Sequence, residues 1–145
     1  MTGKGAPQLV MDTEELHSFL AEAFPQVAED FTVDRVDVEG IRLRMRVSQR
    51  HLRPGGTVSG PSIFALADVG VYLALLSRLG PVALAVTTNC AIDFMRKPSA
   101  EADLIAEVRL LKLGRVLAVG DTLIHSDGES VPVARASLTY SIPPR

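Results

Sequence analysis

The stretch VSGPSIFALADVGVYLALL, residues 58–76, sets the architecture, because it is almost wholly apolar and long enough for one central helix. Pro61 stands just inside the predicted helix start, where a missing N–H has no intrahelical partner to lose, so it opens the helix. We expect the helix to run to about Arg78, with Gly80-Pro81 as its stop signal. Since apolar residues occupy nearly every side, most sides of the helix should be buried.

Asp68 is the one charged residue in this stretch. An ionised carboxylate in an apolar interior is unfavourable unless it is paired, hydrogen-bonded or protonated. Phe64 and Tyr72 share its helical face, so the helix supplies no charged partner nearby. Three interpretations remain open: a functional carboxylate, exposure of one helix stripe, or an ion pair with Arg50, Arg53 or Arg78.

The rest of the chain predicts strands and one short helix. Residues 41–47 alternate between apolar side chains and arginines, as in a half-buried strand, and residues 36–40 predict a hairpin into it. After the helix, residues 82–95, 104–113, 116–125 and 131–142 predict four further strands. A capping box at Asp12 and Glu15 starts an N-terminal helix that ends near Pro25. These elements predict an α+β fold with an antiparallel sheet wrapped around the central helix.

Length and composition favour a single domain over residues 1–145, with residues 1–8 as a flexible tail. The net charge of −2, with scattered basic residues, gives no footprint for nucleic acid. The N-terminus lacks a signal-peptide layout, and the apolar run is too short to span a bilayer, so we expect a cytoplasmic protein without a membrane partner. We expect the single cysteine, Cys90, to be a small buried residue. The chain has no second cysteine for a disulfide, and no other ligand near Cys90 for a metal site.

The segment before the helix favours binding of a carbonyl group. Gly55, Gly56, Ser59 and Gly60 are small enough to let a ligand approach the backbone, and the N–H groups of a helix start form a partial positive pole. The Gly60 N–H could stabilise the oxyanion that develops on a thioester or ester. Asp68 follows about 12 Å further along the helix, within reach of the same acyl group through its side chain and a water.

Residues 51–140 resemble the hotdog-fold thioesterases, and within them the branch related to the phenylacetate-degradation (PaaI-like) thioesterase. HLRPGGTVSGPSIFALAD, residues 51–68, is similar to a signature in which an Asn, a glycine loop and a His-Gly-Gly element precede a helix with a catalytic Asp or Glu. TTNCAIDFMRKP, KLGR and SDGESVPVARASLTY resemble the following strand, a tight turn and the closing hairpin. The resemblance implies a hotdog fold, in which a long sheet encloses the central helix.

The resemblance also implies an activity and its residues. Such proteins hydrolyse acyl-CoA or acyl-carrier thioesters without a metal or redox cofactor, at sites between the subunits of a homodimer or a homotetramer built as a dimer of dimers. Asp68 would act as general base or as nucleophile, and the Gly60 N–H would polarise the thioester carbonyl. Tyr72, Thr88 and Asn89 would orient water or substrate.

Further positions would contact the substrate, and three depart from the pattern of the resembled family. The phosphates of coenzyme A would meet three cations that follow two strands, Arg96, Lys97 and Arg115, with Gly114 as a further contact position beside Arg115. Arg53 and Ser59 stand where the family has Asn and His, and Pro61 replaces the second glycine, which removes one N–H. Two main hypotheses follow: an acyl-CoA thioesterase that uses Arg53 and Ser59 for substrate binding, or a non-catalytic acyl-CoA or lipid-binding protein. A hotdog dehydratase is a weaker third, because the sequence has no His-containing motif suited to water elimination.

Overall fold

The computed structural model describes residues 8–144, and the tail predicted for residues 1–8 lies outside this range except for Gln8. Its two main helices are α1 (Thr13–Ala23) and α3 (Gly60–Leu79), and between them lie a single turn, α2 (Pro25–Ala28), and a short 3-10 segment (Gln49–His51). The strands are β1 (Phe31–Asp37), β2 (Gly40–Met45), β3 (Val86–Phe94), β4 (Leu104–Leu113), β5 (Leu117–Ser126) and β6 (Pro132–Ser141).

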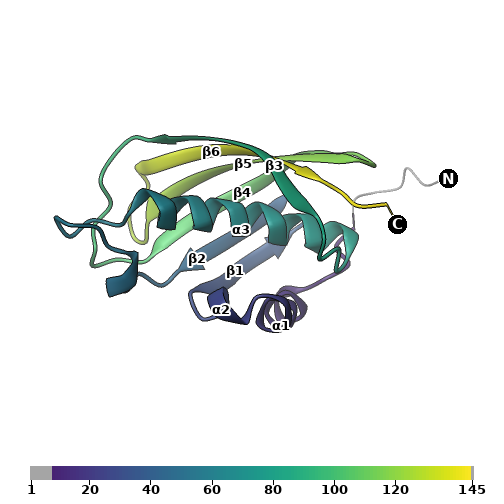
Figure 1. The fold of residues 1–145 in the computed structure, drawn as a ribbon, viewed down its shortest axis with the longest axis horizontal. Helices are drawn as coiled ribbons and strands as arrows, with labels where there is room; N and C mark the ends of the chain where they lie inside the picture. Colours follow the sequence, from purple (N-terminus) through teal and green to yellow (C-terminus); the bar gives the residue numbers. More distant parts are fainter. Residues whose placement is uncertain (1–7, 145) are drawn as a thin grey trace.

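The strands form one antiparallel six-stranded sheet in the order β1-β2-β4-β5-β6-β3. The sheet curves around α3, while α1 and α2 lie beside β1 and β2 (Figure 1). This is the α+β hotdog architecture that the sequence predicted. The two strands at the edges of the sheet are β1 and β3.

The central helix is the core of the molecule. Its side chains from Val71 to Ser77 are all buried, and alternate residues of the strands pack against them. Within residues 8–144, α3 is the single helix that is long and apolar enough to cross a membrane, but 61% of its apolar window is buried in the protein. Because the sheet covers it, we assign α3 as the core helix of a globular fold.

The local signals predicted both helices well. Asp12 caps α1 and forms the predicted capping box with Glu15. Ser59 caps α3, Pro61 lies in its first turn, and Gly80 ends it with a φ of 93°. A positive φ of this size suits glycine, which explains why the helix stops there.

Some predicted strand limits were wrong. β1 begins at Phe31, five residues before the predicted hairpin segment. The sequence pattern missed this start because a register shift between Val33 and Arg35 breaks the alternation of side chains along the strand. β3 begins at Val86 and not at residue 82, since the preceding residues form a turn closed by the Ala85 N–H and the Val82 carbonyl. The hairpin turn itself lies between Asp37 and Gly40.

The arginines of β2 lie on the outer face of the sheet, as predicted, but they are not simply solvated. The Arg44 guanidinium contacts Asp34, Asp103 and Asp127, at nitrogen to oxygen distances of 2.9, 3.1 and 2.8 Å. These hydrogen bonds lower the pKa of the Asp127 carboxyl and raise the pKa of Arg44. The arginine therefore links β1, β2 and the turns that flank β4 and β5.

Substitution of Gly40 should lower the stability of the folded protein strongly. A Cβ atom at this position would lie 1.8 Å from the backbone oxygen of Val108 on β4, a distance that backbone cannot relieve without breaking the ladder. We expect Gly40→Ala to lower the free energy of unfolding by about 3 kcal/mol in urea titrations. Val38→Ala, at an exposed position of the same turn, should stay within about 0.5 kcal/mol of wild type, and equal stability of both variants would contradict the close approach.

Candidate active site

Asp68 lies in the third turn of α3, on the side that faces β3 and β6, and is half-buried. The Thr87 hydroxyl donates a hydrogen bond to Oδ1 of Asp68 at 2.6 Å, and the Tyr140 hydroxyl donates to the same oxygen at 2.7 Å. Thr87 and Tyr140 are paired residues of β3 and β6. The carboxylate is thus held by two neutral hydroxyls from neighbouring strands.

The arginines considered as partners of Asp68 bind elsewhere. Arg50 pairs with Asp30, and Arg78 donates to the backbone carbonyls of Gln8 and Val38. The exposed Arg53 forms no ion pair with Asp68 in the described part of the chain. Its backbone closes a turn instead, with its N–H bonded to the Thr57 carbonyl. Structural pairing with a cation therefore does not explain why an aspartate stands in this helix.

An aromatic cluster supports the Tyr140 side chain. Tyr140 is only 3% exposed, and burial together with the negative charge of Asp68 raises its pKa far above the usual value, so the phenol keeps its proton. The rings of Tyr140 and Tyr72 are 6.0 Å apart, and Phe24 packs edge-on to Tyr72. The Tyr72 hydroxyl donates to the Ala83 carbonyl at 3.1 Å. Tyr72 therefore fixes the segment before β3, and its ring lies behind the site.

The start of α3 exposes a backbone donor. The Ser59 hydroxyl accepts a hydrogen bond from the Ser62 N–H and donates to the Ser62 hydroxyl, so it acts as the helix cap. The Gly60 N–H has no hydrogen-bond acceptor within residues 8–144, and Pro61 has no N–H to offer. The ring of Phe94 lies over this position, 3.4 Å from where a Cβ of Gly60 would be. The open donor is thus flanked by apolar surface.

The strand residues proposed to orient water lie beside the residue that contacts Asp68. The Thr88 hydroxyl donates to the Thr139 carbonyl at 3.3 Å, and the side chain of Asn89 is exposed. A register shift between Thr87 and Asn89 changes which side chains of β3 face α3, so that Thr87 and not Thr88 points toward the helix. Sequence reasoning missed Thr87 and Tyr140. The available signal for Tyr140 was a polar side chain at the end of the buried alternate series Ala134, Ala136 and Leu138.

Residues 55–133 match the family model described as Thioesterase superfamily. The chain belongs to the thioesterase superfamily. A Pseudomonas aeruginosa protein named "Putative esterase PA0474" is 32% identical over 99 residues, which are 68% of this chain and 72% of that protein.

Solved structures agree with this membership. The crystal structure of a "putative thioesterase" from a Silicibacter species is 56% identical, with a TM-score of 0.89 over 95% of this chain and 96% of that one. A mutant of the phenylacetic acid degradation protein PaaI from Thermus thermophilus is 26% identical, with a TM-score of 0.71 over 82% of this chain and 99% of that one. The predicted resemblance to hotdog-fold, PaaI-like thioesterases is confirmed.

The cations expected to meet coenzyme A lie apart in this superfamily member. Arg96 and Lys97 follow the end of β3, where the Arg96 guanidinium donates to the Pro132 carbonyl. Gly114 and Arg115 form the turn between β4 and β5, at the end of the sheet where Leu117, Ser141 and Val86 pair side by side. One copy of the chain therefore places the two groups of cations at opposite ends of β3.

Cys90 contradicts the expectation of a buried core residue. It lies in the middle of the edge strand β3 and is half-buried. The prediction failed because the sequence does not show that β3 is an edge strand, which within residues 8–144 has a neighbouring strand on one side only. Partial burial and the negative charge of Asp68 raise the pKa of the Cys90 thiol, so it does not form a ready thiolate nucleophile.

The free edge of β3 carries exposed apolar side chains. Val86, near its start, is 55% exposed, and Phe94, at its end, is 53% exposed. Leu84 and Met95, just outside the strand, are also exposed. Soluble proteins usually cover a long apolar edge strand, because its unpaired N–H and C=O groups invite another strand.

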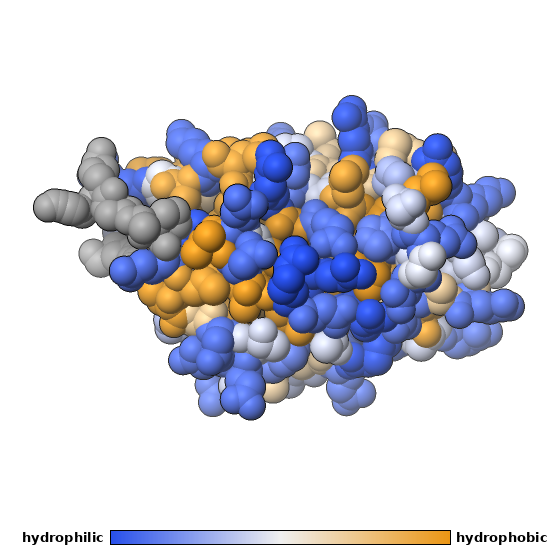
Figure 2. Space-filling model, turned by 180° about the vertical axis from the view of Figure 1, so that it is seen from behind, coloured by the Kyte–Doolittle hydropathy of each residue, from blue (hydrophilic) through white to orange (hydrophobic). Residues whose placement is uncertain are grey.

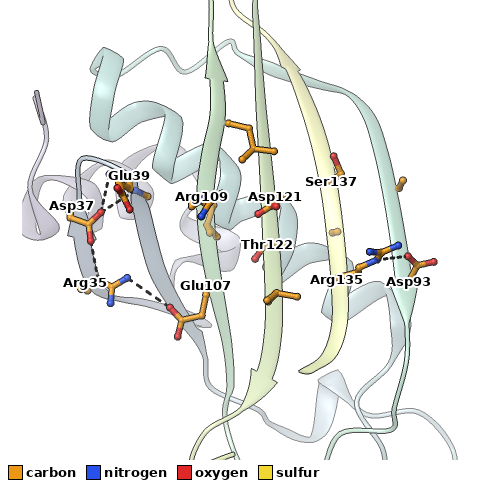
Figure 3. Close-up of a pocket in the computed structure, with 16 residues that line it drawn as sticks. Arg35, Asp37, Glu39, Asp93, Glu107, Arg109, Asp121, Thr122, Arg135 and Ser137 are labelled. Carbon is orange, nitrogen blue, oxygen red and sulfur yellow. Dashed lines mark hydrogen bonds and ion pairs between the residues drawn. The ribbon is translucent and has the colours of Figure 1, made fainter. Parts of the chain in front are cut away.

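The hollow on the outer face of the sheet has a different character. It has a volume of about 690 Å³ and faces away from α3 (Figure 3). Several of its charged groups pair with each other, as in the contacts of Arg35 with Asp37 and of Arg135 with Asp93. Hydrophilic side chains cover much of this face (Figure 2). Since neither Asp68 nor the start of α3 lines the hollow, it is separate from the candidate active site.

Proposed function

We propose that the chain is an acyl-CoA thioesterase in which Asp68 acts on the thioester as general base or as nucleophile. Membership of the thioesterase superfamily supports a thioester hydrolase as the broad class of activity. The observation that carries the finer proposal is the Asp68 carboxylate itself. It stands in an otherwise apolar helix, and two hydroxyls orient it without neutralising it.

The proposed site needs two copies of the chain. Asp68 lies at the Thr87 end of β3, whereas Gly60 lies under Phe94 at the opposite end of the same strand. If β3 pairs antiparallel with β3 of a second copy about its centre, Thr87 of one copy lies next to residues 93–94 of the other. Asp68 of one copy would then approach Gly60 of the second copy, and two-fold symmetry would create two such sites.

The same pairing of two β3 strands would bring the cations proposed to bind coenzyme A close together. Arg96 and Lys97 of one copy follow Phe94, and they would lie next to the Val86 end of the second copy, near its Arg115. Three positive side chains could then meet the phosphates of one coenzyme A molecule. Arg53, which is exposed in the turn before α3, is a further candidate for a substrate carbonyl or phosphate.

The proposed reaction uses water and no metal or redox cofactor. With Asp68 as general base, water gives a proton to the carboxylate and its oxygen bonds to the thioester carbon, while the carbonyl oxygen takes the negative charge. The Gly60 N–H stabilises that oxyanion, the C–S bond then breaks, and the thiolate of coenzyme A takes the proton from Asp68. With Asp68 as nucleophile, a carboxylate oxygen bonds to the thioester carbon and the C–S bond breaks, which releases coenzyme A as its thiolate. Water then cleaves the mixed anhydride to the free acid and the Asp68 carboxylate, and the proton released goes to the thiolate.

The assembly and location are also part of the proposal. We take the protein to be cytoplasmic, and to act as a homodimer through β3 or as a homotetramer made from two such dimers. The apolar edge of β3 supports the dimer, because Val86 and Phe94 would be covered by it.

Release of free thiol from short, medium and aromatic acyl-CoA thioesters tests this function. We expect turnover of at least one class, with a single acid product and stoichiometric coenzyme A. Saturable binding without hydrolysis on every member would contradict the thioesterase and support the non-catalytic acyl-CoA or lipid-binding alternative.

A further inference from the structure

We propose that Tyr140 is a positioning residue that reserves one oxygen of Asp68, Oδ2, for the reaction. This inference rests on the proposed function and names the reacting atom within it. The Tyr140 hydroxyl, together with that of Thr87, occupies Oδ1, and it also lies 3.1 Å from the backbone carbonyl oxygen of Asp68. Tyr140 acts through Asp68 and does not itself meet the substrate.

The hydrogen bonds around the carboxylate are one-sided. Each oxygen of a carboxylate offers about two lone-pair sites, and both sites of Oδ1 are filled by Thr87 and Tyr140. Within residues 8–144, no side chain donates a hydrogen bond to Oδ2. A water molecule or a thioester carbon can therefore approach one oxygen of Asp68 and not the other.

The two donors are themselves fixed by the fold. Thr87 and Tyr140 are cross-strand partners in β3 and β6, so the sheet sets their separation. The Tyr140 ring is buried against the Tyr72 ring, and the Tyr72 hydroxyl is bonded to the Ala83 carbonyl. Because the raised pKa of Tyr140 keeps its hydroxyl protonated, Tyr140 remains a donor throughout the neutral range. The carboxylate plane is thus held in one orientation.

Few other titratable groups lie near the Asp68 carboxylate. Tyr140 faces Asp68 from β6 and Cys90 lies near it on β3, while Tyr72 is one turn further along α3. No lysine or arginine in the described residues forms an ion pair with Asp68. Loss of the Tyr140 hydroxyl should therefore change the orientation of the Asp68 carboxylate.

The test is Tyr140→Phe, which keeps the buried ring and removes only the hydroxyl. We expect kcat for acyl-CoA hydrolysis to fall about 10- to 100-fold while KM changes less than about threefold, because the carboxylate loses its fixed geometry. An unchanged kcat would overturn the proposal.

Ser77→Ala is the matched control. It removes another buried hydroxyl of α3, one that donates to the Ala74 carbonyl at 2.6 Å, and leaves Asp68 untouched. We expect some loss of thermal stability but a wild-type kcat. If both variants lowered kcat alike, the effect of Tyr140 would be structural and the proposal would fail.

A second measurement needs no substrate. Carbon-13 NMR of aspartate-labelled protein reports the surroundings of the Asp68 carboxyl, whose signal is identified by its loss in Asp68→Asn. At neutral pH this signal should lie at a different chemical shift in Tyr140→Phe than in wild type, and identical signals would contradict a Tyr140 hydrogen bond to the carboxylate. A displaced signal in a protein that hydrolyses no thioester would refute the proposed function and leave the hydrogen bond established.

Discussion

Asp68→Asn should lower kcat for thioester hydrolysis by about a thousandfold, which is the usual scale for loss of a group that transfers a proton in the transition state. An amide has the size of the carboxylate, and its oxygen can still accept hydrogen bonds from Thr87 and Tyr140. It can neither take a proton from water nor attack a thioester carbon. The measurement is thiol release from the best acyl-CoA substrate at saturating concentration.

The controls for Asp68→Asn are its thermal unfolding midpoint and its affinity for an uncleavable acyl-CoA analogue. Both should stay close to wild type, because the substitution removes charge and keeps shape. Turnover equal to that of wild type would exclude Asp68 from the reaction. A loss of turnover together with loss of folding would instead be examined in Asp68→Glu, which keeps the charge.

Gly60→Val should lower kcat/KM by about a hundredfold, the loss expected when one oxyanion donor is blocked. The open N–H of Gly60 is flanked by the Phe94 ring, which lies 3.4 Å from the position of an added Cβ. A branched side chain here would crowd the space through which a carbonyl oxygen reaches the N–H. Steady-state kinetics with the same acyl-CoA measures the effect.

Gly60→Ala is the graded control for the helix start. Its single methyl group fits at ordinary contact distance once the exposed Phe94 ring moves slightly, so the loss should be much smaller than for valine. Gly60→Val with full activity would show that the thioester carbonyl does not use this N–H.

The central helix was predictable because its signals are local. Pro61 near the start and Gly80 at the end are visible in the sequence, and both ends agree with the structure within one residue. β1 was predicted too short because its bulge near Asp34 interrupts the alternation from which strands are recognised. The turn at residues 82–85 is apolar, so hydrophobicity could not separate it from β3.

The candidate site was only half predictable for a related reason. Asp68 is conspicuous because a charge in an apolar helix is itself a local signal. Thr87 and Tyr140 lie 19 and 72 residues away in the chain, and their contact with Asp68 depends on strand register. The bulge in β3 then exchanged the faces of neighbouring residues, so that Thr88 was predicted where Thr87 is found.

The predictions for coenzyme A binding depend on something that no single chain contains. Arg96 and Arg115 lie at opposite ends of the sheet in one copy, and only a second copy paired through β3 would bring such ends together. Whether a residue serves its own copy or a neighbour's is a property of assembly, and hydrophobic periodicity carries no information about it.

An active site that combines Asp68 of one copy with Gly60 of another can be tested by mixing two inactive chains. Asp68→Asn and Gly60→Val are coexpressed with different affinity tags, and mixed dimers are isolated by two successive purifications. Such a dimer would contain one intact site, so we expect about half of the wild-type activity per dimer. Activity no higher than that of the parent variants, or failure to recover any mixed dimer, would contradict a site shared between two copies.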